Sequence, residues 1–161
     1  LGGGTLMGLA SHLLTRPSFP ELVRLAERGQ RDRADLLIGD VYDAHGFEEA
    51  GLSLELTAAN LGKLANTDEK IGREDIAQAL MGLVGENLGL ITGHIAARFR
   101  ISRAIFVGSP FRENSSLARI LLAVTRRLDL DAEILEGGEF AGAQGALLAA
   151  RDKLTTRGSW F

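Results

Sequence analysis

The sequence contains no cysteine, one tryptophan, one tyrosine and three prolines among its 161 residues. Without cysteine the chain has neither disulfide bonds nor thiolate chemistry, and this composition fits a cytoplasmic protein. No apolar run reaches the roughly 20 residues that a membrane-spanning helix needs, and no signal peptide is visible. Basic residues are not in excess: the net charge is −3 and the pI is about 5.6. We therefore expect one domain with neither a membrane nor a nucleic acid as partner.

Glycine, by contrast, is abundant, with 20 residues. Gly2, Gly3 and Gly4 precede Thr5 and run directly into a helical pattern of apolar residues. Glycine lets a ligand approach the main chain, and a helix start offers N–H groups without intrahelical acceptors. The segment predicts a phosphate site with a Thr5 hydroxyl donor, or else a tight turn at a domain edge. A phosphate loop normally follows a strand, so a chain that opens on Leu1 at this loop is expected to be a fragment.

The first half of the chain predicts short helices. One is expected over 6–14, where Arg16-Pro17 ends it, and a second starts at the capping box of Ser18 and Glu21. A third is expected over 32–41. Loops are expected at 42–53 and 66–72, and the small apolar segment 56–64 between them carries the polar side chains of Thr57 and Asn60.

The longest regular segment is a helix expected over 73–98, where apolar residues recur at steps of three and four. Four glycines follow the same spacing on one face: Gly82, Gly85, Gly89 and Gly93. Each costs about 1 kcal/mol relative to alanine, so the row indicates that another backbone packs closely there. That partner is either a segment of the same chain or a second subunit. Glu86-Asn87 on this helix is expected on a solvated or interface face.

The final third reads as strand, loop and helix, twice over. A buried strand is expected over 103–108, a loop over 109–114, and a helix over 117–128 capped by Ser115 or Ser116. A second strand over 132–135, a glycine turn over 136–140 and a last helix from Ala141 follow. This order is typical of an α/β domain, where ligands bind beyond the carboxyl ends of strands. The two loops and the opening glycines together favour a nucleotide cleft, and the small residues 141–146 allow close approach of a ligand or a strand.

Five blocks in this order resemble the type II pantothenate kinases of the Fumble family. They are LGGGT (1–5), ELTAANLG (55–62), VGE (84–86), IFVGSPFREN (105–114) and EGGEFAGAQGAL (136–147). The resemblance implies that 1–161 is the C-terminal lobe of an actin-like, sugar-kinase-like ATPase domain, α/β and helix-rich with a short sheet. The implied reaction is phosphoryl transfer from ATP and Mg²⁺ to pantothenate, the first step of coenzyme A synthesis.

The resemblance also implies roles for particular residues. Gly2, Gly3, Gly4 and Thr5 would contact the ATP phosphates, and Gly108, Ser109, Phe111, Arg112 and Asn114 would form the nucleotide side of the site. Arg112 is the cation most suited to a phosphate, with a surface salt bridge as the alternative. Ala123 and Arg127 would reach the pantothenate pocket of a second copy, in a homodimer formed through helix 73–98. Coenzyme A or acyl-CoA would be the feedback ligand.

No residue matches the family's first phosphate loop, its catalytic glutamate or its pantothenate-binding arginine, so no catalytic residue is assigned. The chain alone is therefore expected to lack kinase activity. His12, His45 and His94 lack ligand spacing, so no metal site is assigned either. Two alternatives remain: another member of the ATPase superfamily, such as a sugar kinase or an acyl-CoA dehydratase activator, and a degenerate regulatory module that binds nucleotide or acyl-CoA. The 136–147 block and the lack of cysteine ligands disfavour the first.

Overall fold

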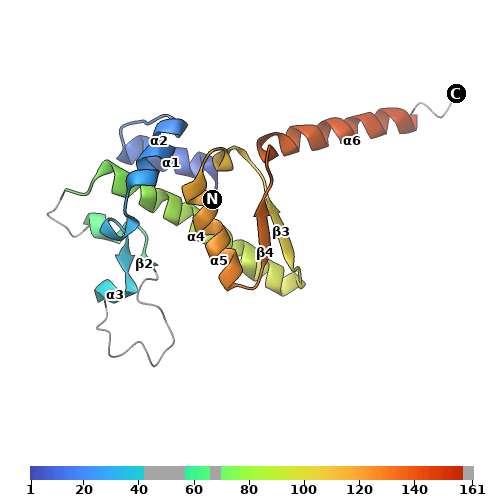
Figure 1. The fold of residues 1–161 in the computed structure, drawn as a ribbon. Helices are drawn as coiled ribbons and strands as arrows, with labels where there is room; N and C mark the ends of the chain where they lie inside the picture. Colours follow the sequence, from blue (N-terminus) through green and yellow to red (C-terminus); the bar gives the residue numbers. More distant parts are fainter. Residues whose placement is uncertain (42–56, 66–69, 158–161) are drawn as a thin grey trace.

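A computed structural model describes residues 1–41, 57–65 and 70–157 of the chain. The described part is a helix-rich α/β fold with two short two-stranded sheets (Figure 1). Its α-helices are α1 (Gly3–Leu13), α2 (Phe19–Arg28), α3 (Ile38–Val41), α4 (Arg73–Phe99), α5 (Ser115–Arg127) and α6 (Ala141–Arg157). Its strands are β1 (Leu36–Leu37), β2 (Thr57–Ala59), β3 (Arg103–Phe106) and β4 (Asp131–Ile134). Short 3₁₀ turns are η1 (Arg31–Arg33), η4 (Gly62–Ala65), η5 (Ser109–Phe111) and η6 (Gly138–Phe140). The predicted loop over 42–53 and most of the predicted turn over 66–72 lie outside the described residues.

The first two helices form largely as the sequence predicts. α1 begins at Gly3 rather than at residue 6, so the glycines belong to its first turn. The capping box of α2 is confirmed, because Ser18 Oγ accepts a hydrogen bond from Glu21 N at 3.4 Å. Gly29 ends α2 with an extended backbone, and a Cβ there would collide with the carbonyl of Glu74. Close approach to the start of α4 is therefore what requires glycine at this position.

The helix predicted over 32–41 is wrong. The segment instead forms η1, strand β1 and the short helix α3, and β1 pairs with β2 in an antiparallel ribbon. The cause is long-range: the buried carboxylate of Asp35 accepts a hydrogen bond from Leu61 N at 2.7 Å. That bond holds this part of the chain beside residues 57–65, which local propensity cannot predict.

The long helix is confirmed as α4, and its glycine row packs within the chain. A Cβ at Gly89 would lie 2.8 Å from Val124 Cβ, and Gly85 and Gly93 face Ile120 and Leu128 in the same way. Three of the four glycines thus let α5 lie close to α4, whereas Gly82 faces a guanidinium group described below. Leucines and alanines of α1, α2, α4 and α5 form the core.

β3 and β4 are parallel neighbours, with Arg103 opposite Asp131 and Phe106 opposite Ile134, and α5 forms the crossover between them. The expectation of a fully buried strand over 103–108 is wrong, because Ile105 is 54% exposed and Val107 and Leu135 are exposed beside it. Within the described residues only one face of this sheet is covered by helices.

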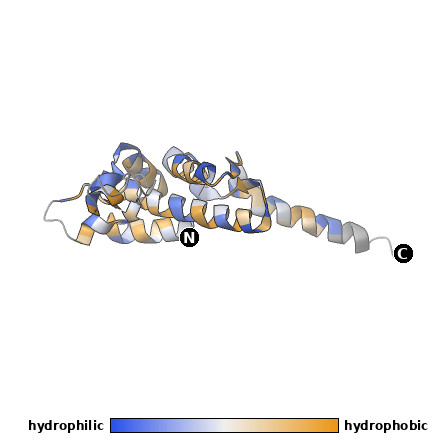
Figure 2. Cartoon of the chain, turned by 90° about the horizontal axis from the view of Figure 1, so that it is seen from below, coloured by the Kyte–Doolittle hydropathy of each residue, from blue (hydrophilic) through white to orange (hydrophobic). Residues whose placement is uncertain are grey.

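α6 projects away from the rest of the chain in both views (Figures 1 and 2). Apolar and polar residues alternate along it (Figure 2), and every residue from Gly142 to Asp152 is exposed. No described strand approaches residues 141–146 closely, since a Cβ at Gly142 or Gly145 would meet nothing within 4 Å; the approach of a ligand there stays a prediction. No described helix is long and apolar enough to cross a membrane.

Candidate nucleotide-binding site

A cavity of about 1100 Å³ lies where the start of α1, helix α2 and the turns after β3 and β4 meet. It is lined by Gly3 and Gly4 from the opening loop and by Gly108, Ser109 and Arg112 from the turn after β3. These five residues are among those that the sequence assigns to nucleotide binding. The structure therefore brings the two predicted glycine loops to one shared cavity, although more than 100 residues separate them in the sequence.

The start of α1 directs main-chain donors toward this region. Gly2 is the N-cap, without a side-chain hydrogen bond, and the first intrahelical bond runs from Leu6 N to Gly2 O at 3.0 Å. The amides of Gly3, Gly4 and Thr5 precede that bond, so they have no acceptor inside the helix. No acidic residue occupies the first turn, which leaves the positive end of the helix dipole unopposed from within the helix.

Four of the predicted nucleotide residues are absent from the described lining of the cavity: Gly2, Thr5, Phe111 and Asn114. Phe111 turns inward and packs against the core, edge-on to Phe106 with ring centroids 6.2 Å apart. Asn114, not Ser115 or Ser116, caps α5, accepting a hydrogen bond from Leu117 N at 3.1 Å. The partly buried Phe111 and the buried Asn114 are therefore supports of the turn after β3.

One wall of the cavity was missed by the sequence analysis. α2 contributes Phe19, Pro20, Val23, Arg24 and Glu27. The wall combines apolar surface with one exposed cation, Arg24, on a different element from Arg112. The capping box predicts where α2 begins, but no local signal tells which of its faces borders a cavity. Met7, Pro110, Glu113 and Glu139 complete the lining; the last three belong to the two loops predicted to border a ligand, but none of them was assigned individually to the site.

Ala123 and Arg127, the predicted pantothenate contacts, lie elsewhere. Both are exposed on α5, four residues apart and so on the same face of the helix, and neither lines the cavity in the described structure. A substrate that these two residues contact would therefore lie outside the cavity of their own chain.

A second cavity, of about 990 Å³, borders the N-terminal end of α4. Its lining is strongly charged, and four of those charges form two ion pairs: Arg28 with Glu74 at 3.6 Å and Arg33 with Asp75 at 3.9 Å. None of the residues predicted for nucleotide binding borders it. Candidate chemistry therefore belongs to the cavity at the glycine loops.

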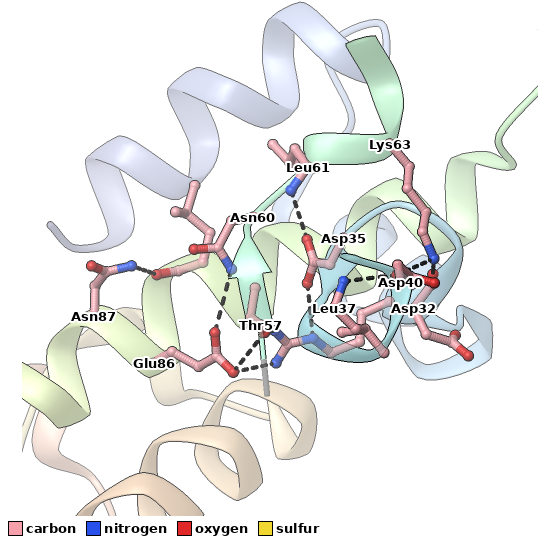
Figure 3. A network of polar contacts seen from close by, with 12 residues as sticks. Asp32, Asp35, Leu37, Asp40, Thr57, Asn60, Leu61, Lys63, Glu86 and Asn87 are labelled. Carbon is pink, nitrogen blue, oxygen red and sulfur yellow. Dashed lines mark hydrogen bonds and ion pairs between the residues drawn. The ribbon is translucent and has the colours of Figure 1, made fainter. Parts of the chain in front are cut away.

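The described part of the ELTAANLG block, from Thr57 on, meets the VGE block in a partly buried polar network (Figure 3). Arg31 pairs with Asp35 at 2.9 Å and with Glu86 at 2.9 Å, and its guanidinium group lies against Gly82. Burial raises the pKa of the Asp35 carboxyl above 3.8, although the Leu61 amide and Arg31 oppose that rise. Burial alone would lower the pKa of Arg31, but the Glu86 and Asp35 carboxylates raise it overall.

Thr57 and Asn60 complete the network from the β2 segment (Figure 3). Thr57 Oγ1 donates to Glu86 Oε1 at 3.2 Å and also bonds the Arg31 guanidinium, and Asn60 Nδ2 donates to Glu86 Oε2 at 3.3 Å. The face expected to be solvated is only partly so: 23% of the Glu86 side chain is exposed, and the rest joins α4 to the β1–β2 ribbon. None of the side chains named in this network lines either of the two cavities described above.

Comparison with known proteins supports the family that these sequence blocks indicate. The family model Fumble matches residues 1–149. This chain belongs to the Fumble family. A type II pantothenate kinase from Oceanobacillus iheyensis is 33% identical over 150 residues, which are 93% of this chain and 56% of that protein. A type II pantothenate kinase from Bacillus anthracis is 34% identical over 153 residues, 95% of this chain and 54% of that protein.

This Fumble-family chain thus spans about half the length of the curated relatives it matches, and the matching part is their C-terminal half. The resemblance inferred from the sequence blocks is confirmed at the level of the family. Within the described residues no group of three or more His, Asp or Glu side chains is arranged to hold a metal ion.

Proposed function

We propose that this chain is part of an ATP-dependent pantothenate kinase with an actin-like ATPase fold, and that the cavity between the two glycine loops holds the nucleotide. The observation that carries the proposal is the convergence of Gly3 and Gly4 with Gly108 and Ser109 on one cavity. Its volume of about 1100 Å³ is ample for a nucleotide, because small-molecule sites typically measure about 300–1,000 Å³.

The lining suits the parts of ATP. The main-chain amides at the start of α1 and the side chains of Arg24 and Arg112 suit the phosphates, which bind best to N–H groups and cations. The apolar side chains of Met7, Phe19 and Val23 suit the adenine ring. Such a site contributes to phosphoryl transfer by positioning the nucleotide and balancing its charge. Mg²⁺ at such sites is held largely by the nucleotide phosphates and water, and no residue of this chain is assigned to it.

The acceptor in this proposal is pantothenate, whose phosphorylation yields 4′-phosphopantothenate. Ala123 and Arg127 face outward on α5 and would contact pantothenate bound to a second copy of the chain. An exposed apolar stripe on α4, formed by Ile91, Ile95 and Phe99 at steps of four residues, supports a homodimer through this helix. Coenzyme A carries an adenine nucleotide, so as a feedback ligand it or an acyl-CoA would compete with ATP for the same cavity. We also propose that the protein is located in the cytoplasm.

Thermal unfolding of the 161-residue chain with MgATP tests the nucleotide site. A ligand at 100 times its Kd stabilises the folded state by about 2.7 kcal/mol, which raises the transition temperature of a chain of this size by several degrees. Arg112→Ala and Arg24→Ala are expected to reduce that rise. Arg119→Ala, an exposed arginine on α5 outside the cavity, is the matched control and is expected to leave it unchanged.

A transition temperature that MgATP does not change would contradict the proposed site. A coupled assay for ADP tests the second expectation, which is that the chain alone transfers no phosphate to pantothenate. ADP formation that depends on pantothenate would overturn that expectation. Nucleotide binding without turnover is also what a regulatory module would show; a catalytic glutamate in any sequence upstream of Leu1 would favour the kinase, and its loss there would favour the regulatory module.

A further inference from the structure

Asn114 stands directly after the turn that lines the candidate cavity, but its side chain points away from that cavity. It is only 2% exposed, whereas its neighbours Arg112 and Glu113 are exposed and line the cavity. A buried amide must satisfy its hydrogen bonds inside the protein, so the partners of Asn114 reveal its role.

The side chain of Asn114 joins three separate parts of the molecule. Its Oδ1 accepts a hydrogen bond from Leu117 N, in the first turn of α5, at 3.1 Å. Its Nδ2 donates to Pro110 O in the turn after β3 at 3.0 Å, and contacts the sulfur of the buried Met81 on α4 at 3.4 Å. One amide therefore connects the cavity turn to both long helices of the core.

The turn takes positive φ at both ends, which glycine tolerates at Gly108 but which is unfavourable at Glu113, so the turn needs an anchor. Gly108 has φ of 128° and Glu113 has φ of 51°, values that L-residues other than glycine rarely adopt. The described backbone supplies only short-range bonds to the turn: Phe111 N donates to Gly108 O, Arg112 N to Ser109 O and Asn114 N to Phe111 O. Positive-φ residues persist where surrounding structure fixes them.

We infer that Asn114 is a positioning residue, which holds the Gly108–Glu113 turn against α4 and α5 and thereby sets the shape of the cavity. The consequence for nucleotide affinity rests on the proposed function, but the effect on the turn does not. A helix cap alone needs only the Oδ1 acceptor, so the role of the Nδ2 donor can be tested separately.

Asn114→Asp keeps an oxygen for the Leu117 amide and, when ionised, has nothing to donate to Pro110 O; Asn114→Ser keeps a shorter hydroxyl and lacks the Nδ2 group that reaches Pro110 O. The matched control is Thr125→Val, which removes another buried polar contact on α5, the bond from Thr125 Oγ1 to Leu122 O. Amide hydrogen exchange is measured on each 161-residue chain without ligand, and MgATP affinity is then measured by titration.

In both Asn114 variants we expect the amides of Phe111 and Arg112 to exchange about tenfold faster, as loss of one hydrogen bond predicts, while the amides of α4 keep their rates. In Thr125→Val the Phe111 and Arg112 amides should exchange as in the wild type. MgATP affinity should fall in the Asn114 variants alone. Unchanged exchange at Phe111 and Arg112, or equal acceleration across α4 and α5, would overturn the inference. Faster exchange at the turn in a chain that never binds MgATP would uphold it and reject the proposed function.

Discussion

The ring of Pro110 lies against Gly3, so closely that a Cβ added to Gly3 would stand 2.6 Å from Pro110 Cγ. Pro110 belongs to the turn after β3, and Gly3 is the first residue of α1. The opening glycine loop and the later turn are therefore packed together, not merely adjacent to one cavity. Gly3 has a packing role at this junction, whereas a Cβ at Gly4 would meet nothing within 4 Å.

Gly3→Ala is expected to force the two loops apart, because a proline ring has little freedom to move aside. Overpacking of this kind costs about 1–3 kcal/mol. Gly8→Ala is the control on the same helix: its Cβ enters open space, so it should stabilise the chain by up to about 1 kcal/mol. Urea unfolding measures both, and equal stability of the two variants would contradict the packing role of Gly3.

Arg31→Met should destabilise the chain strongly, because it leaves the fully buried carboxylate of Asp35 without its ion-pair partner. Breaking one side of a buried pair typically costs about 3–5 kcal/mol. Arg103→Met is the comparison: Arg103 pairs with Glu133 at 3.0 Å on the exposed sheet face, where such pairs contribute less than about 1 kcal/mol. Similar urea midpoints for the two variants would show that the Arg31 network does not hold the β1–β2 ribbon.

The ionised Asp40 carboxylate is expected to stabilise the folded chain near neutral pH and to lose this effect in acid. Hydrogen bonds from Lys63 Nζ and from Leu37 N lower the pKa of this carboxyl below 3.8. A carboxyl whose pKa is lower in the folded state stabilises it above the ordinary pKa, and that stability is lost as the pH falls. The difference in unfolding midpoint between wild type and Asp40→Asn should thus shrink below about pH 4. Because the pair is at the surface, the difference should stay below about 1 kcal/mol, and a difference that grows on acidification would refute the assignment.

Ile95→Glu should abolish self-association if α4 forms the proposed homodimer interface. Ile95 lies at the centre of the exposed apolar stripe with Ile91 and Phe99, the last of which is 68% exposed. A charge there would be costly to bury between two copies. Ala97→Glu places the same charge at another exposed position of α4 and should leave association intact. Sedimentation velocity decides: a wild-type chain that stays monomeric at high concentration would remove the support for this interface.

Local rules predicted the elements that depend on local signals. The capping box of Ser18 and Glu21 predicted the start of α2, and the apolar period predicted α4 to within one residue of its end at Phe99. The rule that ligands bind beyond the carboxyl ends of strands predicted that the turns after β3 and β4 border one site, as Ser109 and Glu139 do. The family was evident from long sequence blocks, not from any single residue.

The remaining errors come from contacts between distant segments. Asp35 looked like part of a helix, but its bond to Leu61 and its pairing with Arg31 hold it beside the β2 segment. The family resemblance assigned Asn114 to the nucleotide site, yet it is buried beneath the turn beside Met81 and Leu117. No spacing in the sequence indicates that α2 turns Arg24 toward the same cavity, since that depends on how α2 packs on α4.

The exposure of α6 has a consequence for how the chain loses its structure. A helix of 17 residues is marginal in water without tertiary contacts, and every side chain from Gly142 to Asp152 is exposed. Its unwinding would therefore uncover little additional apolar surface and need not await the cooperative melting of the α1–α5 body. A protease added under native conditions should trim the chain back toward Phe140 first, leaving a resistant product that still contains both glycine loops.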